Sequence, residues 1–570
     1  MTDRRLTGRQ QQTGSERLTG TKRLTQTDRT PSPGADVCII GAGLAGTFLA
    51  YSLASRDHDV VVLEAGKRFD FDEEGRTAEQ LEQAVRPDVS HADMWGMFES
   101  RDAFTNDVPS HIPFDLNNRR VKAVGGTSLA WNGTVMRFPE KDFEMQSRYG
   151  LAMDWPISYD DLRPYYAQAE QEMGVAGEAG PMSPPRENPF PMEPFPLSEP
   201  DELYVEACGE LGINIQRIPH ARNTTEYDGR SVCEGYGTCS PFCPTGARYD
   251  ASVHIRRAEA EGARIIDRVP VLSLEHDDAG EEVTAAVYAT PDGERHRQEA
   301  THFVVACGPV ETPRLLLLSD SDEYPDGLAN TSGAVGRYFQ AKTYINTRAQ
   351  LDEPIQPTQT GFDTTMSHEF YEPEDASTGS IWLVFRNDDP VPVVHRALRP
   401  SPLTEISGNP WGDDLLGQLR DADPAGFSNL RISAYLEQLP EEDNRVTLDE
   451  SRTDMYGNPV PKVEFSFTER TERTMERAQE VHREIFEGMG LEVTSQDDAL
   501  ERLSTDHKGT TRMGDDPDES VVNGQGQTHD LRNLWLSGPS VFTTGGAVEP
   551  GLTVVALALK TADHIHDTLQ

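Results

Sequence analysis

The 570-residue chain carries 96 acidic residues against 52 basic ones, which gives a formal net charge of -44. So large an acidic excess repels phosphate backbones and anionic lipid surfaces, and it argues against nucleic acid as a partner. The length exceeds what one hydrophobic core normally supports and predicts two domains.

The acidic residues are spread along the chain rather than gathered in one tail, and lysine is scarce beside arginine. Acidic runs occur at Asp70–Glu74, Glu275–Asp278 and Asp515–Glu519. This pattern is typical of a surface adapted to high salt, where ions screen the repulsion between like charges, and it predicts a halophilic protein. An ordinary acidic, soluble surface is the alternative.

The first 34 residues are rich in Thr, Arg, Gln and Gly and nearly lack apolar side chains. Such a segment cannot bury enough apolar surface to offset the entropy lost on ordering, so we expect residues 1–34 to be disordered. It contains no apolar segment like that of a secretory signal, and nothing later in the chain approaches the ~18 consecutive apolar residues of a membrane span. We therefore expect a cytoplasmic protein that does not span a membrane.

Regular structure is expected from Asp36 onward. The composition there predicts a buried parallel strand over residues 37–40, a helix over about 44–55 and a second strand over 60–63. Further along, Ser158 followed by Asp161 has the pattern of a capping box and predicts the start of another helix.

The turn between the first strand and the first helix contains a glycine motif. Gly41 allows a tight turn, Gly43 lets the backbone approach a pyrophosphate, and Gly46 lets the helix pack against the strand. Glu64 ends the second strand, where a carboxylate can accept hydrogen bonds from the hydroxyls of an adenosine ribose. The segment predicts a dinucleotide site without distinguishing FAD from NAD. A glycine-rich turn that binds no ligand is the alternative.

The middle of the chain changes character twice. Proline-rich sequence over residues 181–196 predicts an extended surface connection, because proline lacks the backbone donor that a helix or central strand needs. The region from about 340 to 440 mixes turns with short strand-like runs, including 380–386 and 430–436. It predicts an antiparallel sheet in the second domain.

Two helices are expected near the C-terminus. Apolar residues at helical spacing between Met475 and Met489 predict a helix that packs in the core, and a last helix over about 553–566 returns to the nucleotide-binding domain.

The predicted fold class is α/β, with a Rossmann-like domain and a second α+β domain built on an antiparallel sheet. The predicted organisation is a disordered segment (1–34), the N-terminal part of the Rossmann-like domain (35–339), a substrate-binding domain (340–470) and a returning C-terminal part (471–570).

Four segments together resemble the glucose–methanol–choline (GMC) oxidoreductases, and the resemblance covers nearly everything after residue 35. The segments are Ala123–Gly133, Val304–Leu316, His507–Gly514 with Ser520–Asn523, and Asn533–Thr544 with Glu549–Thr553. The resemblance implies FAD with its ring between the two domains, and hydride transfer from an alcohol carbon to flavin N5. Some relatives tether FAD through a histidine where this chain has Ala130, so a non-covalent cofactor is expected.

The resemblance also implies which residues outside the first motif contact the flavin nucleotide. They are Gly125, Gly126, Thr127, Asn132, Gly538 and Thr553. Thr510 is a further flavin neighbour by the same argument. For Asn132 and Thr510, roles in turns and caps are the alternatives.

Three cysteines crowd into a short loop rich in glycine and proline. Cys233, Cys239 and Cys243 have a spacing similar to that of GMC sugar and polyol dehydrogenases that carry a 3Fe–4S cluster, and such loops turn backbone N–H groups toward bound sulfide. We expect these thiolates to hold a 3Fe–4S cluster. Two alternatives stay open: a loop that retains its cysteines without a cluster, and a zinc site completed by a residue such as His220 or His254.

Oxidation of an alcohol needs a proton acceptor near the flavin, and histidine suits that role because its unperturbed pKa lies near neutrality. Of the 15 histidines only His507 falls in a segment that the resemblance places at the flavin, so it is the expected base. Its interval to Gly509 is one residue shorter than usual in the family, which leaves a supporting role as the alternative. Where relatives carry a second His or Asn, this chain has Glu549, for which catalytic and structural roles are both open.

These expectations combine into a function. The chain is expected to be an FAD-dependent dehydrogenase that oxidises an alcohol or sugar and passes electrons to an acceptor other than a nicotinamide. An electron-acceptor protein or small subunit is a further expected partner. An oxidase that produces hydrogen peroxide and a non-redox lyase of the same fold are the alternatives.

Overall fold

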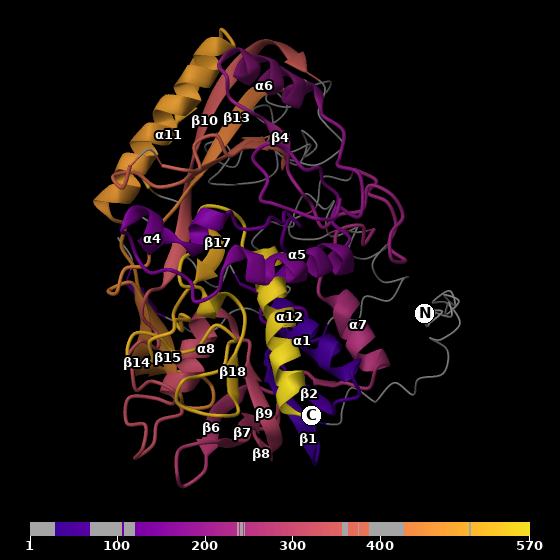
Figure 1. Ribbon diagram of the computed structural model, residues 1–570, viewed down its shortest axis with the longest axis vertical. Coiled ribbons are helices and arrows are strands. Elements are labelled where there is room, and N and C mark those ends of the chain that lie inside the picture. Colours follow the sequence, from indigo (N-terminus) through magenta and orange to yellow (C-terminus); the bar gives the residue numbers. More distant parts are fainter. Residues whose placement is uncertain are drawn as a thin grey trace, which may run out of the picture.

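The computed structural model of the protein describes residues 29–68, 105–107, 120–235, 239, 243, 245–355, 363–373, 375–386, 427–500 and 503–570. Residues 1–28 of the leading segment and the acidic run Asp70–Glu74 lie outside the described residues. A parallel sheet lies in the lower half of the molecule and an antiparallel sheet in the upper half (Figure 1).

The parallel sheet has five strands in the order β18-β9-β1-β2-β5. Its central strands are apolar runs rich in β-branched residues, and such runs suit a sheet that is covered on both faces. The parallel pairing of Val37 with Val60 confirms the predicted strand–helix–strand unit. The strands are β1 Ala35–Ile40, β2 Val60–Leu63, β5 Arg264–Ile266, β9 Ala300–Val305 and β18 Leu534–Leu536.

Helices cover this sheet, and one of them comes from the far end of the chain. Helix α12 packs against α1 and α5, and α7 packs against another side of α1 (Figure 1). Because it is covered on several sides, α1 is buried along nearly its whole length. The predicted capping box is present at the start of α5, where the Ser158 hydroxyl accepts a hydrogen bond from the Asp161 backbone. The helices are α1 Leu44–Ala54, α5 Tyr159–Met173, α7 Ser252–Ala260, α8 Gly308–Leu317 and α12 Gly551–Thr568.

The antiparallel sheet has the order β16-β10-β13-β12-β11-β4, and β17 pairs with β10 beside β16. The predicted runs 380–386 and 430–436 are confirmed as neighbouring strands. The sheet also recruits β4, β16 and β17 from outside residues 340–470. The strands are β4 Gln216–Arg217, β10 Gln340–Ile355, β11 Asp363–Ser367, β12 Ile381–Arg386, β13 Phe427–Leu436, β16 Val493–Gln496 and β17 Leu503–Lys508.

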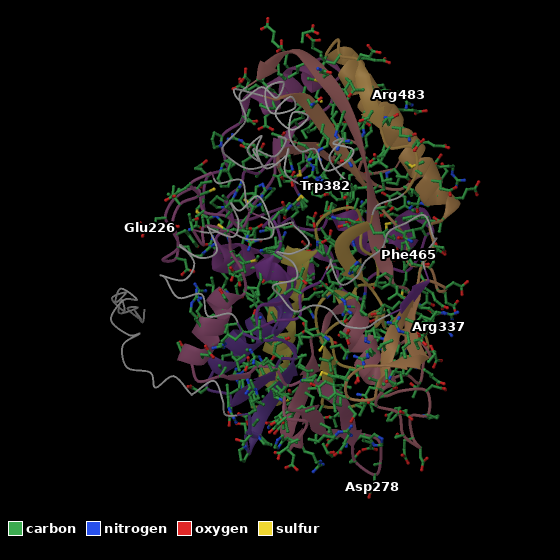
Figure 2. All side chains as sticks on the ribbon, turned by 180° about the vertical axis from the view of Figure 1, so that it is seen from behind. Glu226, Asp278, Arg337, Trp382, Phe465 and Arg483 are labelled. Atoms are coloured by element: carbon green, nitrogen blue, oxygen red, sulfur yellow. The ribbon has the colours of Figure 1, made fainter. Side chains whose placement is uncertain are left out.

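Two helices pack on one face of the antiparallel sheet. Helix α11, Glu469–Gly488, turns its apolar residues toward β10 and β13, and α6, Glu199–Glu210, lies beside it. Trp382 lies within the body of this half of the molecule, whereas Arg483 lies on the outer side of α11 (Figure 2).

Smaller elements complete the fold. Two three-stranded sheets have the orders β14-β15-β3 and β6-β7-β8. Their strands are β3 Thr105–Asp107, β6 Val271–His276, β7 Val283–Ala289, β8 Arg295–Gln298, β14 Arg445–Thr453 and β15 Pro459–Glu464. The short helices are α4 Met145–Tyr149 and the 3-10 turns η2 Gly126–Leu129, η3 Glu140–Phe143 and η4 Pro539–Val541.

The observed architecture confirms the predicted fold class, a parallel-sheet nucleotide domain joined to a domain built on an antiparallel sheet. The end of the leading segment is described from residue 29, and it contacts the parallel-sheet part. Arg29 forms an ion pair of 2.8 Å with Asp267, and its carbonyl accepts a hydrogen bond from the Tyr288 hydroxyl. Among the helices described, none is both long and apolar enough to cross a membrane.

Candidate functional site

The first glycine motif forms the turn from β1 into α1. An added Cβ on Gly46 would lie 2.0 Å from the carbonyl oxygen of Gly41, so only glycine lets α1 pack this closely. Gly43 is different, because an added Cβ there would meet nothing within 4 Å. Gly43 is also the N-cap of α1 and supplies no side-chain cap, which leaves the first N–H groups of the helix available to an anion.

The second glycine motif lies directly against the first. The backbone N–H of Gly125 donates to the carbonyl of Ala42 at 2.8 Å, and an added Cβ on Gly126 would lie 2.8 Å from the Cα of Gly43. Thr127 supports this turn, since its hydroxyl accepts a hydrogen bond from the Val121 backbone at 3.1 Å. We call the two motifs, Gly41–Gly46 and Gly125–Thr127, the glycine cradle.

Glu64 is anchored in the glycine cradle. Its two carboxylate oxygens accept hydrogen bonds from the backbone N–H groups of Ala42 and Gly66, each at 2.7 Å. Burial raises the pKa of Glu64, and the two hydrogen bonds oppose that shift. Each oxygen keeps a further lone pair for a ribose hydroxyl, so the expected role at the adenosine is compatible with this position.

The C-terminal residues of the predicted nucleotide site also converge here. Gly538 follows β18 and lies beside the start of α1, with an added Cβ 3.7 Å from the Cβ of Ala45. Thr553 in the first turn of α12 shares a hydrogen bond of 2.7 Å with the hydroxyl of Tyr166. The open space at Gly43, the uncapped helix and the anchored carboxylate of Glu64 together fit a dinucleotide.

Asn132 and Thr510 occupy strained or turn positions near the cradle. The Asn132 side chain accepts a hydrogen bond from the Thr134 backbone at 3.0 Å, a local contact typical of a turn. It also donates to the carboxylate of Asp363 at 3.3 Å. Thr510 has a φ of 88°, and its hydroxyl donates to the carbonyl of Pro309 at 2.9 Å. A positive φ at a non-glycine residue stores strain and is typical of functional sites.

His507 lies in β17, where it is buried and stacked on Phe339 with ring centroids 5.5 Å apart. Because successive side chains of a strand point to opposite faces, the neighbouring Asp506 points the other way. Asp506 and Glu549 both contact the ammonium group of Lys342 in β10, at 3.0 and 3.1 Å respectively. The structure therefore brings Glu549 together with Asp506, which the sequence analysis did not select.

Asp506 and Glu549 are also hydrogen-bonded to each other, and we call them the acid pair. The side chains of Asp506 and Glu549 are 13% and 16% exposed, whereas that of Lys342 is 1% exposed. Burial raises the pKa of Glu549 to about 8, with the negative charge of Asp506 adding to the effect and Lys342 opposing it. For Asp506, Lys342 and the hydrogen bonds from Glu549 and Ser504 outweigh burial and lower the pKa.

Aromatic rings and a second lysine enclose the acid pair. The ammonium of Lys342 lies 4.6 Å from the ring centre of Tyr435 and 5.1 Å from that of Trp382. Lys508 donates to the carbonyl of Gly545 at 2.8 Å. Burial and the charge of Lys342 lower the pKa of Lys508 to about 8.

One signal could have found Asp506 in the sequence. His507 stands one residue closer to Gly509 than the corresponding family histidine does, and stepping back by one residue reaches Asp506. Lys342 had no such signal, because β10 is brought to β17 only by the pairing of the antiparallel sheet.

The three loop cysteines lie in a cationic environment. The guanidinium of Arg222 donates to the sulfur of Cys239 at 3.2 Å, and the Arg248 backbone donates to the sulfur of Cys243 at 3.5 Å. Burial alone would raise the pKa of Cys243, but the charge of Arg248 and several hydrogen bonds lower it; burial raises the pKa of Cys233. Arg222 is buried, and its Nε and Nη2 have no hydrogen-bond partner among the described residues.

The histidines considered as a fourth zinc ligand have other partners. His220 bonds to the carbonyl of Asp363 at 2.6 Å, and His254 bonds to Tyr249 and Glu172 at 2.7 and 2.9 Å. Over the described part of the chain, no three His, Cys, Asp or Glu side chains are grouped so that they could hold a metal ion. An iron–sulfur cluster, unlike a single ion, does not require its thiolates to converge on one point.

Comparison with known proteins supports the resemblance seen in the sequence. Two family models described as GMC oxidoreductase match residues 38–343 and 440–558. The fructose dehydrogenase large subunit of Gluconobacter japonicus is 32% identical over 94% of this chain and 98% of its own length. The 2-methyl-1,2-propanediol dehydrogenase of Mycolicibacterium austroafricanum is 29% identical over 94% of this chain and 96% of its own length.

A solved structure confirms the fold. Pyridoxine 4-oxidase from Mesorbium loti superposes with a TM-score of 0.62 at 18% identity, covering 94% of this chain and 99% of its own. At that identity the likeness concerns the arrangement of the two sheets and their helices and not the reaction.

Proposed function

The chain belongs to the GMC oxidoreductase family, and on that premise we propose that it is an FAD-dependent dehydrogenase that oxidises an alcohol group of a sugar or polyol. The supporting observation is the junction between the glycine cradle and the acid pair. Gly551, two residues after Glu549, lies so close to Trp131 that an added Cβ would be 2.8 Å from its ring. Trp131 follows the second glycine turn, so the segment that carries Glu549 packs against the segment that carries this turn.

Family membership implies FAD, and the residues present fit it. The uncapped start of α1 at Gly43 would hold the pyrophosphate, and Glu64 would bind the ribose. Ala130 offers no nucleophile for a covalent tether, which supports non-covalent binding. When bound, FAD supplies a ring system that accepts a hydride from the alcohol carbon.

The protein itself must take the proton of the substrate hydroxyl. The sequence analysis put forward His507 and Glu549, and these side chains belong to opposite sides of β17. Both are buried enough to hold a defined position, and either can accept a proton in principle.

We further propose that Cys233, Cys239 and Cys243 hold a 3Fe–4S cluster. The supporting observation is the cationic setting, in particular the buried Arg222, which donates to Cys239 while two of its nitrogens have no partner among the described residues. At Cys243 this setting lowers the pKa and favours the thiolate, which is the form that binds iron. When bound, the cluster would carry electrons from the flavin. Iron and acid-labile sulfide assays on the purified protein test this, and a protein that contains neither would contradict it.

A partner protein is a consequence of this electron path. The relative from Gluconobacter japonicus is a large subunit, which supports the proposal that an electron-acceptor protein or small subunit also serves this chain. The acceptor would then be neither oxygen nor a nicotinamide.

The test is anaerobic mixing of the FAD-loaded protein with a panel of sugars, polyols and alcohols. We expect one class of substrate to bleach the flavin absorbance, and an added dye acceptor to restore it. Peroxide formation in air at the same rate would instead assign an oxidase. Substrate turnover with the flavin unreduced would assign a lyase.

From the acidic surface we also propose that the protein is adapted to high salt. The run Asp515–Glu519 is exposed along its whole length, as a repelling acidic surface requires. We expect the melting temperature to rise as salt is raised from dilute to molar concentration. A melting temperature that is independent of salt would contradict the proposal.

A further inference from the structure

The proposed function leaves open which side chain takes the proton of the substrate hydroxyl. We propose that Glu549, hydrogen-bonded to Asp506 and ion-paired to Lys342, is the group that takes the proton of the substrate hydroxyl, and that Asp506 and Lys342 are its positioning residues. The inference rests on the proposed function, because it assigns the base of that reaction.

The geometry shows two carboxyl groups and one ammonium in mutual contact. Lys342 lies within 3.1 Å of both carboxylates, and the two carboxyl groups are hydrogen-bonded to each other. An ionised carboxylate is only an acceptor, so a hydrogen bond between two carboxyl groups requires a shared proton. The acid pair therefore holds one proton when this contact is made. Loss of that proton leaves Glu549 as a base.

The charged groups around Glu549 decide when that proton leaves. Lys342 of β10 and Lys508 of β17 favour its loss, while Asp506 opposes it. Tyr435 of β13 faces Glu549 from the sheet and accepts a hydrogen bond from Arg386 at 2.7 Å. The balance leaves the pKa of Glu549 at about 8, close to the value that suits a general base in mildly alkaline solution.

The step balances in atoms and electrons. The O–H bond of the substrate breaks, and its proton binds the carboxylate of Glu549. The electron pair of that bond forms the new C=O bond, while the carbon's hydrogen leaves as a hydride to the FAD that the proposed function requires. Lys342 keeps the carboxylate in place, and Asp506 accepts the hydrogen bond of the protonated Glu549.

His507 fits this role less well. Its ring stacks on Phe339, and its position in β17 directs it away from Asp506 and Glu549. Both carboxylates contact Lys342. His507 is better suited to packing the junction between β17 and β10.

The first arm of the test uses infrared difference spectroscopy on the substrate-free protein. We expect a protonated-carboxyl band in the wild type that disappears as the pH rises through about 8 and that is missing from E549Q. In D506N the band should disappear at lower pH, because a negative neighbour is gone. The matched control E437Q removes another buried, lysine-paired carboxyl group and should leave the band unchanged. A band that is the same in wild type and E549Q would overturn the proposal.

The second arm measures the rate of flavin reduction under anaerobic conditions. We expect E549Q to be slower by about 10²–10⁴-fold, E549D to recover part of that loss, and H507N to change the rate far less. Wild-type reduction rates in E549Q with a large loss in H507N would assign the base to His507. If no alcohol reduces the wild-type flavin, the proposed function fails, and the infrared arm still reports on the acid pair. Circular dichroism confirms that each variant is folded.

Discussion

The molecule contains two buried groups of the same composition, each a lysine between an aspartate and a glutamate. In the Lys141 group, Lys141 contacts Asp142 at 2.8 Å and Glu437 at 3.2 Å. In the Lys342 group, Lys342 contacts Asp506 at 3.0 Å and Glu549 at 3.1 Å. By these distances alone the two groups could not be told apart.

They differ in what surrounds the glutamate. Glu437 accepts a second cationic hydrogen bond, from Arg470 at 2.9 Å, and it is 2% exposed. Burial would raise the pKa of Glu437, but Lys141 and Arg470 together outweigh it and hold the pKa at about 2. Glu549 directly contacts one cation, Lys342, and has a carboxylate neighbour; its side chain is 16% exposed, and its pKa rises to about 8.

The number of cations that contact each glutamate therefore helps to set the direction in which its pKa moves. With two cations in contact, Glu437 stays ionised at neutral pH. Its ion pair with Lys141 links the end of β13 to η3. With one cation shared between two carboxylates, Glu549 changes protonation near neutral pH. Buried groups whose pKa is displaced by such crowding are typical of catalytic sites.

The rate of flavin reduction should differ most strongly between variants of the two groups. We expect E549Q to slow flavin reduction by about 10²–10⁴-fold and E437Q to leave it within about tenfold of the wild type, because only Glu549 accepts a proton in the reaction. Anaerobic stopped-flow absorbance of the two variants, loaded with FAD to the same extent, measures the contrast. Equal losses in both would show that the distinction is wrong.

The free energy of unfolding should show the opposite order, with the larger loss in the variant of Glu437. We expect E437Q to lower the free energy of unfolding by about 3–5 kcal/mol, because it leaves two buried cations with too little negative charge. At pH 6, E549Q should cost much less, since the protonated glutamate that it replaces is already neutral. Denaturant unfolding of the two variants at that pH compares them. A larger loss in E549Q would contradict the assignment.

The pH dependence of stability isolates Glu549. Its pKa in the folded protein lies above its ordinary value, so between about pH 5 and 8 the folded state holds a proton that the unfolded state has released. Stability that depends on this proton falls as the pH rises through that window. Relative to the wild type, E549Q should therefore gain at most about 1.4 kcal/mol per pH unit between about pH 5 and 8. Parallel stability curves would rule out a raised pKa.

Removing one cation should make the Lys141 group behave more like the Lys342 group, and this is the smallest effect that we expect. R470M removes the second cation beside Glu437, and we expect the pKa of that carboxyl group to rise by about 1 unit or more. Infrared titration of the variant should show a protonated carboxyl group at a higher pH than in the wild type. If R470M leaves the titration of Glu437 unchanged, the second cation is not what distinguishes the two groups.

Features of the fold that depend on neighbouring residues could be predicted from the sequence. The turn Gly41–Gly46 and the capping box at Ser158 were predictable because each depends on residues next to one another in the chain. The family resemblance selected the second glycine turn and the segment around Glu549. Both rest on local backbone requirements that a motif records.

The proton-exchanging group was not predictable in the same way. Lys342 reaches Asp506 through pairing of β10 with β17, and no local pattern encodes that contact. The choice between Asp506 and His507 depends on which face of β17 points to Glu549, a property of the assembled sheet. Lys141 and Glu437 likewise lie 296 residues apart in the chain, so their grouping with Arg470 could not be inferred from motifs.

The pH dependence of anaerobic flavin reduction in the wild type and in D506N tests most directly whether Glu549 is the base. We expect the wild-type rate to rise with pH through about 8 and then level off, because Glu549 must first lose its proton. In D506N the rise should occur at lower pH, since the carboxylate that holds the proton on Glu549 is gone. A rate that does not change between about pH 6 and 10, or a rise that occurs at the same pH in both proteins, would contradict it.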